Sequence, residues 1–466
     1  MATAIWWIRR DLRLEDNEAL THALQTAESV IPVFILDPTL LQSPNTGEKR
    51  VAFLFEGLRQ LESDLQAKGS RLIVRRGKPL AELTQLLRES QAEVIFAEED
   101  FTPYARRRDA QVANALPLRL VGGTAVHHPA TVLKADGTPY IVFTPFSKVW
   151  RERPSPTHTL PQPGSISSPS EMESSPLPDD PQLGDNLPFP PGEAEAQRRL
   201  RMFAEDCMYG YAESRDRLDL EGTSQLSPYL HLGMLSARQA VLTAQRAIAE
   251  APNQEAQKGA SAWLNELIWR EFYIAILYHF PYVLERSFRE RYEDIAWHNS
   301  EELFEAWQEG RTGFPVIDAA MQQLRQIGWM HNRARMIVAS FLVKDLLINW
   351  QWGERWFMQR LIDGDLASNN GGWQWTAGTG TDAAPYFRIF NPTSQSKKFD
   401  PNGQYIRRWL PQLANVPDKY IHEPSKMPSK LQKEIGCLIG QDYPAPIIDH
   451  SEARKRALEV YGQTKQ

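Results

Sequence analysis

The chain has 466 residues, a length that suggests two or three domains with enough sequence to bury a core in each. Hydrophobic residues make up 42% of it, and no apolar run approaches the length that crosses a bilayer, so we predict a soluble protein. A net charge of −6 argues against general polyanion binding, and two cysteines, Cys207 and Cys437, are too few for a disulfide framework or a metal or iron-sulfur site. The start MATAIWWIRRDLR shows no secretory signal, so these features together indicate the reducing cytoplasm.

Residues 1–130 alternate strand and helix patterns. Runs rich in β-forming residues occur at 3–9, 29–36, 70–76, 92–99 and 117–123, and helical spacing occurs at 16–25, 48–69 and 104–116. The alternation predicts a doubly wound parallel sheet, with Gly69 capping the second helix. IRRDLR follows the first strand where a nicotinamide-binding domain has GxGxxG, so the usual pyrophosphate turn is missing. A ligand at the carboxyl ends of the strands is still expected.

We assign residues 131–194 to a linker, because the composition changes between residues 152 and 193. Eleven of the 33 prolines lie between residues 154 and 191. Because proline cannot continue a helix or a central strand, we expect an extended connector between two domains, 1–130 and 195–466. A long structureless loop is unusual in a compact protein, so the connector should wrap over the surface rather than form a free tether.

From residue 195 to the end, helical patterns replace strand patterns. Residues 261–280 and 331–362 carry apolar side chains at helical spacing over many turns, too densely for surface helices. They predict an all-helical domain with a large core. Tryptophan is concentrated here, since 11 of the 14 lie between residues 263 and 409, a density that core filling alone does not explain.

The segment EGTSQLSPYLHLG, residues 221–233, allows two interpretations. Thr223, Ser224 and Ser227 precede a helix with Pro228 at its first position, and hydroxyls together with backbone N–H groups at a helix start suit a phosphate. Ser227 can equally cap that helix without any ligand. The residues alone leave both interpretations open.

The segment WLNELIWREFY sets a carboxylate beside indoles at intervals of three or four residues. The side chains on this helical face are Trp263, Glu266, Trp269, Arg270 and Tyr273. Most such stripes belong to a core with an ion pair at its edge. Glu266 between Leu267 and Ile268 would nevertheless be costly to bury without a partner, which makes a cleft the second interpretation.

The next long helix is expected to open with GWMHNRARM. Asn332 and Met336 are four residues apart, so an amide and a thioether share one face, while Arg333 and Arg335 point elsewhere. His331 alone is more typical of a structural histidine than of a catalytic base.

The stretch GDLASNNGGWQWTAGTGTD, residues 364–382, has neither helical nor strand periodicity, which predicts a loop, although flexible loops seldom carry tryptophans. Asp363 and Asp365 around Gly364 fit a turn with side-chain caps better than a metal loop, since no further acid follows at calcium-loop spacing. Residues 396–408 hold four basic residues against one acid, which fits a nucleic-acid contact or a solvated face.

Residues 263–273, 328–347, 363–375 and 386–400 together resemble the DNA photolyase and cryptochrome family, in detail its class I bacterial cyclobutane pyrimidine dimer photolyases. The resemblance runs from IRRDLRLEDN to RRWLPQL, nearly the whole chain. It implies an N-terminal α/β antenna domain, a wrapping linker and a helical domain that holds FAD. The reaction it implies is electron transfer from photoexcited, fully reduced flavin to the dimer, whose cyclobutane ring then splits and returns the electron.

The same resemblance assigns residues to FAD. The segment from Thr223 to Ser227 matches a grip on the phosphates, Arg335 matches an ion-pair partner of Asp363, and Asn369 matches a position near the flavin N5. Gly371 and Gly372 would let the backbone pass close to the cofactor in a rigid segment. This permissive backbone would also let the two neighbouring indoles diverge, Trp373 toward the flavin and Trp375 toward the lesion. The full matched set is Tyr211, Thr223, Ser224, Gln225, Leu226, Ser227, Trp263, Arg270, Arg335, Asp363, Gly364, Asp365 and Asn369.

The implied substrate is a pyrimidine dimer flipped out of DNA. Trp269 and Trp375 would form flat walls around it, Glu266 and Asn332 would hydrogen-bond the base edges, and Met336 would line the floor. A desolvated Glu266 favours its protonated form, which could donate to a dimer carbonyl that carries the extra electron.

Further matches concern DNA and electron transfer. Trp373, Trp350 and Trp297 match a chain that carries an electron from the surface to oxidised flavin, although each alone is more typical of a core. Phosphate contacts near the lesion match Arg215, Arg333 and Lys397. The whole set matched to DNA is Arg215, Glu266, Arg270, Tyr273, Asn332, Arg333 and Lys397.

The antenna chromophore is where the sequence departs from part of the family. Members that bind methenyltetrahydrofolate carry an Asn-Glu pair where this chain has Tyr104 and Ala105. The surrounding residues resemble members that bind 8-hydroxy-5-deazaflavin, which is therefore the favoured antenna, with no bound antenna as the alternative in a heterologous host. The matched residues are Ile35, Leu36, Asp37, Arg50, Asp100 and Arg108.

Three other functions compete. A cryptochrome shares the fold and FAD without repair, but plant cryptochromes carry Asp where this chain has Asn369, and no long tail follows the fold. A (6-4) photolyase carries a His pair at the position of His331 and Asn332, and the second His is absent here. A dark oxidoreductase explains the α/β domain but not the tryptophan-rich helices. We therefore expect a DNA-repair enzyme that acts as a monomer on damaged DNA, without a metal or a membrane partner.

Overall fold

The computed structural model describes residues 2–184 and 187–464. They form two compact units, each built from segments that are distant in sequence. The first unit comprises Met1–Ala212, Thr223–Pro281 and Ile362–Ser368, and the second comprises Glu213–Gly222, Tyr282–Leu361 and Asn369–Gln466. The sequence-based domain limits at residues 130 and 194 stay a prediction.

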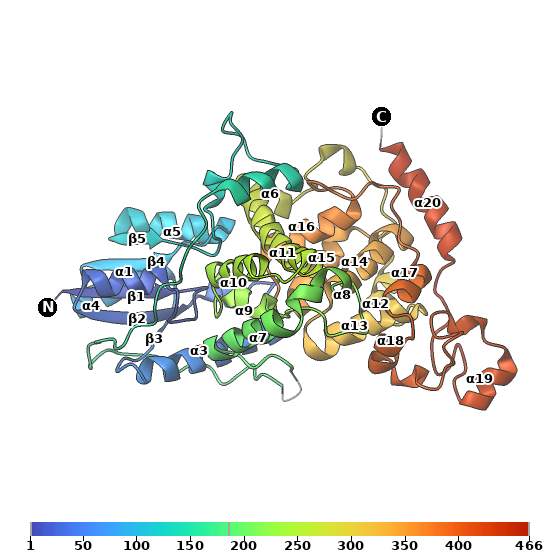
Figure 1. Cartoon of the computed structure of the whole chain (residues 1–466), viewed down its shortest axis with the longest axis horizontal. Coiled ribbons are helices and arrows are strands. Elements are labelled where there is room, and N and C mark those ends of the chain that lie inside the picture. Colours follow the sequence, from blue (N-terminus) through green and yellow to red (C-terminus); the bar gives the residue numbers. More distant parts are fainter. Residues whose placement is uncertain (1, 185–186, 465–466) are drawn as a thin grey trace. The chain divides into compact units, whose positions relative to one another are not determined.

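Figure 1 labels most of the strands and helices along the chain. The strands are β1 (Thr3–Ile8), β2 (Ser29–Leu36), β3 (Ile73–Arg76), β4 (Val94–Glu98) and β5 (Leu118–Val121). The helices up to residue 281 are α1 (Glu18–Thr26), α2 (Pro38–Leu41), α3 (Glu48–Gln66), α4 (Pro79–Ser90), α5 (Pro103–Ala115), α6 (Phe143–Glu152), α7 (Glu193–Asp206), α8 (Tyr211–Ser214), α9 (Ser227–Leu232), α10 (Ala237–Ala249) and α11 (Gln254–His279). Those that follow are α12 (Glu301–Glu309), α13 (Pro315–Ile327), α14 (Asn332–Ser340), α15 (Trp350–Arg360), α16 (Leu366–Ala377), α17 (Pro392–Phe399), α18 (Gln404–Trp409), α19 (Ser429–Ile435) and α20 (His450–Gln463).

The five strands form one parallel sheet in the order β3-β2-β1-β4-β5. Side chains along a strand alternate between its two faces. On one face, Trp7 of β1 and Val33 of β2, which pair in register, join buried side chains of α4 and α5 in an apolar cluster. Helix α1 packs along β1 and β4. Every strand predicted from the sequence is present, which confirms the doubly wound sheet, whereas α4, which begins at Pro79, was not among the expected helices.

The connector contains no helix or strand among its described residues between 154 and 191, and it lies along the sheet. The N–H of Val30 donates to the carbonyl of Ser167 at 2.8 Å, and the N–H of Ser175 donates to the carbonyl of Val74 at 2.8 Å. Since β3 is an edge strand, the second contact covers backbone groups that would otherwise be exposed. These hydrogen bonds hold this part of the connector along the sheet, whereas the earlier part of residues 131–194 contains α6.

Local signals explain two neighbouring helices of the first unit, of which α11 carries candidate site residues. Helix α11 begins where the side chain of Asn253 accepts the N–H of Ala256 at 2.8 Å. Helix α10 begins with a capping box formed by Ser236 and Gln239. The two helices pack against each other, and α11 also packs against α6.

The second unit is helical and contains one large apolar cluster. Among its buried members are Trp307, Met321, Phe341, Trp350 and Trp373. The predicted helical core is therefore present, and tryptophans are prominent in it. Part of the tryptophan excess between residues 263 and 409 is thus core packing.

The prediction of one long helix over residues 331–362 is wrong. Helix α14 passes into a π-helical turn at Phe341–Asp345, and the chain then leaves the helical conformation. Leu347 takes a φ of +51°, and the side chain of Asn349 accepts the N–H of Gln351 at 2.9 Å, which starts α15. Apolar spacing continued through this break because the residues in it are also buried.

The prediction of a loop at residues 364–382 is also wrong over most of its length, because α16 occupies Leu366–Ala377. Its first turn is capped by the carboxylate of Asp365, which accepts the N–H of Ser368 at 3.0 Å. At its other end, Lys344 donates from Nζ to the carbonyl of Ala377 at 2.9 Å. These caps stabilise a helix that propensity disfavours.

Helical geometry also replaces the reason expected for the divergence of Trp373 and Trp375. Gly371 and Gly372 lie inside α16, and neither has a positive φ. Because an α-helix turns about 100° per residue, two residues that are two apart point in nearly opposite directions. Backbone permissiveness is therefore not needed to separate the two indoles.

Candidate functional site

The turn formed by Asp363, Gly364 and Asp365 anchors the candidate site in the first unit. Ser227 donates from Oγ to Oδ2 of Asp363 at 2.6 Å. Helix α9 begins at Ser227 itself and Leu226 takes the N-cap position, so the interpretation of Ser227 as the helix cap is wrong. The hydroxyl instead fixes the loop before α9 to the turn.

Asp365 is a partly buried carboxylate that stays ionised. Burial opposes its ionisation, but His231 and the guanidinium of Arg10 hold its pKa well below the usual value. Arg10 lies 2.9 Å from Oδ2 of Asp365. Burial lowers the pKa of His231 to about 4, so this ring is neutral near pH 7 and Arg10 supplies the positive charge.

Arg10 also connects this turn to the end of β4. Its Nη1 lies 3.8 Å from Oδ1 of Asp100. Arg50 belongs to the same electrostatic group, because burial lowers its pKa to about 10 while Asp363 and Asp365 oppose that shift. The IRRDLR segment thus places a guanidinium, rather than a glycine turn, at the carboxyl end of β1.

The loop from Thr223 to Leu226 has the donors that a phosphate requires. Gln225 takes a φ of +50°, which turns the backbone just before α9. Among the described residues, no hydrogen bond engages the backbone N–H of Ser224, Gln225 or Leu226. Successive backbone donors beside two hydroxyls fit the phosphates of FAD.

Helix α11 presents its candidate side chains over an arc of roughly 120°, as the helical turn requires. Trp263 is buried, and its ring lies 5.1 Å from that of Phe203, which also contacts Tyr211 at 5.7 Å. Arg270 donates from Nη1 to the carbonyl of Thr124 at 2.7 Å, and burial lowers its pKa. The stripe is therefore partly core, as the first interpretation had it.

The other side chains of that arc are more accessible to solvent than Trp263. Glu266, Trp269 and Tyr273 are all partly exposed. The indole of Trp269 stacks on the ring of Phe143, with 3.7 Å between centroids and 3° between planes. An accessible carboxyl group on the same helical face as a held indole fits the cleft interpretation.

In the second unit, α14 arranges its first residues as expected. Asn332 is exposed, and its Nδ2 lies 4.0 Å from the sulfur of Met336. Arg333 pairs with Asp216 at 2.7 Å and covers the ring of Phe399 at 4.5 Å, whereas Arg335 donates from Nε to the carbonyl of Met330 at 2.8 Å. The predicted pairing of Arg335 with Asp363 stays a prediction.

Asn369 is held by α15. Its Nδ2 donates to the carbonyl of Glu354 at 3.0 Å, and Asn370 donates to the carboxyl group of the same residue at 2.8 Å. Burial raises the pKa of Glu354 to about 7. The amide expected near a flavin is thus fixed by its neighbours in the second unit.

The three tryptophans of the expected electron chain share one packing environment. Trp350 and Trp373 are buried members of the large cluster, and Trp297 packs against it from a partly buried position. The ring of Trp297 also lies 6.0 Å from that of Tyr461. Buried indoles with a more accessible one at the margin fit both a core and an inward route for electrons.

The residues matched to an antenna lie at the carboxyl ends of β2 and β4 and on α3 and α5. Ile35 and Leu36 are buried in β2, and Asp37 accepts a hydrogen bond from the hydroxyl of Tyr104. Arg108 covers the ring of Tyr104 at 5.7 Å, and its charge helps to lower the pKa of Asp100. This edge of the sheet is where a doubly wound fold binds ligands.

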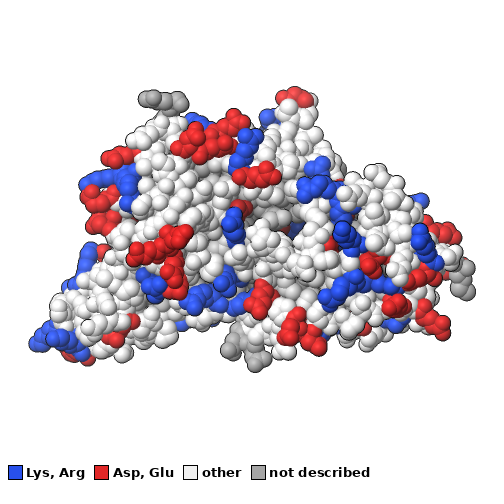
Figure 2. Space-filling view, turned by 180° about the vertical axis from the view of Figure 1, so that it is seen from behind, with Lys and Arg blue, Asp and Glu red and all other residues white. Residues whose placement is uncertain are grey.

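The remaining predicted DNA contacts are spread over the second unit. Arg215 is half-buried, and Lys397 lies 3.3 Å from Glu423. Trp375, which was matched to the wall around the dimer, is half-buried on α16. Figure 2 shows basic and acidic side chains interspersed over the face that it presents. On that face, contacts with a polyanion would therefore come from selected side chains.

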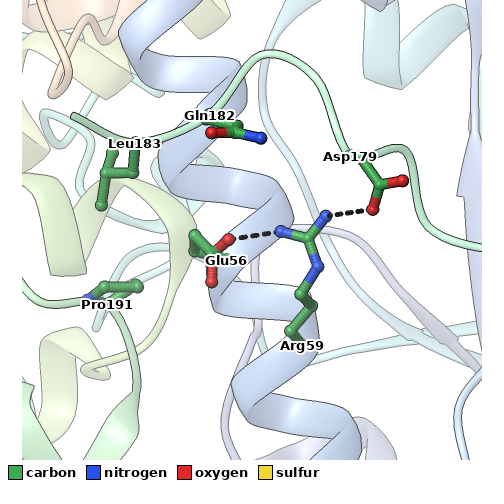
Figure 3. A pocket seen from close by; sticks show the side chains of 6 residues that line it. All are labelled: Glu56, Arg59, Asp179, Gln182, Leu183 and Pro191. Atoms are coloured by element: carbon green, nitrogen blue, oxygen red, sulfur yellow. Dashed lines mark hydrogen bonds and ion pairs between the residues drawn. The ribbon is translucent and has the colours of Figure 1, made fainter. Parts of the chain in front are cut away.

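A surface hollow outside these sites is shown in Figure 3. It is lined by Glu56, Arg59, Asp179, Gln182, Leu183 and Pro191. Arg59 pairs with Glu56 and lies 3.7 Å from Asp179, so its positive charge is already balanced by two carboxylates. None of these residues was a candidate from the sequence.

Sequence reasoning missed Arg10, His231, Glu354 and Phe143. Arg10 stands in IRRDLR, which was noted for lacking glycines rather than for its charges. The other three become relevant only through contacts with residues far away in the chain. Two adjacent arginines directly after a buried strand were the one available signal.

Two family models cover most of the chain. The model described as DNA photolyase matches residues 4–164, and the model described as FAD binding domain of DNA photolyase matches residues 263–463. No helix in the described part of the chain has the length and apolar character needed to span a membrane.

Individual proteins resemble this chain over nearly its full length and theirs. The deoxyribodipyrimidine photo-lyase of Synechococcus sp. is 42% identical, over 100% of this chain and 97% of that protein. A bacterial class III photolyase from Agrobacterium tumefaciens has a similar structure, with a TM-score of 0.94 at 36% identity over 100% of this chain and 98% of the other. A Synechocystis cryptochrome gives a TM-score of 0.90 at 30% identity over 99% of both chains. The chain belongs to the DNA photolyase family.

Proposed function

We propose that this chain is a lyase that uses light to split cyclobutane pyrimidine dimers in DNA, as a class I member of the family. The observation that carries the proposal is the likeness over the full chain to a relative named deoxyribodipyrimidine photo-lyase. The partly exposed α11 face with Glu266 and Trp269 supports it, because a flipped dimer needs a flat wall and a hydrogen-bonding group.

FAD would be held in the first unit by the residues that fit it. The backbone donors of Ser224 to Leu226 would bind its phosphates, and the turn from Asp363 to Asp365 would face the ring system. When bound and reduced, FAD supplies the light-excited electron that opens the cyclobutane ring. The protein's own part is to hold and orient both partners and to exclude water.

The substrate roles are proposed one residue at a time. Trp269 and Trp375 each offer a ring face to the dimer, Glu266 and Asn332 hydrogen-bond its base edges, and Met336 lines the site. Arg215, Arg333 and Lys397 contact phosphates, and Arg270 and Tyr273 are proposed as further contacts with DNA. Trp297, Trp350 and Trp373 pass an electron inward when the flavin is oxidised.

The test is light-dependent repair by the purified, FAD-loaded protein. An oligonucleotide with one cyclobutane dimer should be restored under blue light and not in the dark, and a (6-4) lesion should remain. Repair of the (6-4) lesion alone would change the substrate. Repair of neither lesion would leave the cryptochrome, which the Synechocystis structure keeps as the second candidate.

For the antenna we propose 8-hydroxy-5-deazaflavin, bound near Ile35, Leu36, Asp37, Arg50, Asp100 and Arg108. Support comes from Tyr104, whose hydroxyl already engages Asp37 where folate-binding members carry a different pair. Extraction of protein made in a deazaflavin-producing host, followed by absorption spectroscopy, identifies the chromophore. Recovery of folate or of a second flavin would contradict the assignment. We further propose a cytoplasmic monomer.

A further inference from the structure

We propose that Phe143 is a positioning residue that holds the indole of Trp269 in the orientation required to bind a flipped dimer. This inference rests on the proposed function of Trp269 as a wall for the lesion. Phe143 was not a candidate from the sequence, and it reaches Trp269 from a helix more than one hundred residues earlier in the chain.

The contact has an unusual geometry. The two ring centroids lie 3.7 Å apart, and the ring planes differ by 3°, which is a face-to-face arrangement. Aromatic pairs without other constraints prefer offset or edge-to-face packing. The arrangement is therefore imposed by the surrounding structure rather than by the attraction of the rings.

The surrounding structure is the packing of α6 on α11. Trp150, two turns after Phe143, donates from Nε1 to Oε2 of Glu271 at 2.6 Å. Glu271 also accepts the N–H of Val126 at 2.6 Å, and burial raises its pKa. Arg151 donates to Oδ1 of Asn265 at 2.8 Å. These contacts fix α6, and with it Phe143, against the helix that carries Trp269.

Neighbouring rings restrict Trp269 further. Phe272 contacts it edge-on at 5.5 Å, and Tyr273 lies 5.6 Å away at a tilt of 34°. Phe143 covers one face of the indole, so a dimer can use only the opposite face or an edge. An indole that is already ordered loses little conformational freedom when DNA binds.

The test compares Phe143→Leu, which keeps an apolar side chain but removes the flat ring, with Phe143→Tyr, which keeps the ring. Phe146→Leu is the matched control, because Phe146 contacts Phe272 at 5.3 Å in the same cluster. For each FAD-loaded protein, the Kd is measured for an oligonucleotide with a cyclobutane dimer and for the undamaged one. FAD content and photoreduction are recorded in parallel.

We expect Phe143→Leu to raise the Kd for the dimer about three- to tenfold, which is the cost of ordering one side chain on binding. In Phe143→Leu, the Kd for undamaged DNA should stay at the wild-type level, as should the FAD content and photoreduction. Phe143→Tyr should bind the dimer as tightly as the wild type does. Phe146→Leu should leave the ratio of the two Kd values unchanged.

Three results overturn the inference: an unchanged dimer Kd in Phe143→Leu, an equal rise for both oligonucleotides, or loss of FAD, since Phe143 would then serve the fold. Failure of the proposed function is distinguishable, because the wild-type protein would then show no preference for the dimer before any variant is compared.

Discussion

At the scale of single residues, the site combines a partly buried ion pair with groups that are more accessible to solvent. Asp365 stays ionised because Arg10 lies 2.9 Å from it, whereas Glu266 and Asn332 are accessible to solvent. A buried ion pair fixes geometry, because removal of either partner leaves a charge without compensation. The accessible groups are those that can exchange water for a substrate.

Glu266→Gln should keep dimer affinity and reduce the splitting yield several-fold. Glutamine can hydrogen-bond a base edge, but it has no acidic proton to give to a dimer carbonyl that carries extra charge, a proton that Glu266 would hold once the bound dimer excludes water from it. Repair per absorbed photon at saturating enzyme measures the effect. Glu255→Gln, an exposed change on the same helix, is the control, and an unchanged yield in Glu266→Gln would remove this role.

Arg333→Ala should weaken binding of damaged DNA and lower the slope of log Kd against log salt by about one unit, as expected for one lost phosphate contact. The existing pair with Asp216 keeps the guanidinium in place for that contact. Anisotropy titrations over a range of salt concentrations measure it, with the exposed Arg311→Ala as the control. Equal affinity at every salt concentration would contradict the assignment.

At the scale of elements, α16 connects the candidate groups. Asn369 lies in its first turns, and Trp373 and Trp375 lie further along on nearly opposite sides. The indole of Trp373 occupies the space beside Gly353, where a Cβ would lie 2.1 Å from its ring. Close contact with α15 therefore depends on glycine at that position.

Trp373→Phe should abolish most of the photoreduction of oxidised FAD while retaining bound FAD. Phenylalanine fills much of the same space but is far harder to oxidise than tryptophan. Repair by chemically reduced enzyme should continue, which separates the two functions. Trp409→Phe, the same change elsewhere in the cluster, is the control, and normal photoreduction in Trp373→Phe would leave the residue as core only.

At the scale of the whole molecule, a buried carboxyl group should make stability depend on pH. Asp318 is fully buried and accepts hydrogen bonds from Thr312, Gly313 and Tyr443. Burial raises its pKa from 3.8 to about 6. The folded state therefore binds this proton more tightly than the unfolded state does.

The stability that this proton provides is fully present below about pH 4 and is lost as the pH rises through about 6, by about 3 kcal/mol. Denaturant unfolding between pH 4 and pH 7 measures this contribution as the difference in pH dependence between wild type and Asp318→Asn. The variant should show a smaller fall in unfolding free energy over that range. Parallel curves would contradict the raised pKa.

Much of the fold could be predicted from hydrophobic periodicity and from the positions of the prolines. The five strands were recognisable because buried parallel strands read as short apolar runs, and the connector was recognisable from its prolines. Errors arose where tertiary contacts override local preference. Residues 331–362 contain a break among buried residues, and α16 is a helix because Asp365 and Lys344 cap it.

The sequence by itself determined the fold class, the family resemblance and which residue types stand at each candidate position. Only the tertiary structure decided which side chains meet, such as Ser227 with Asp363 and Phe143 with Trp269. The reason is physical: helical and strand periods are local, whereas a hydrogen bond or a ring stack across many residues depends on how the elements pack.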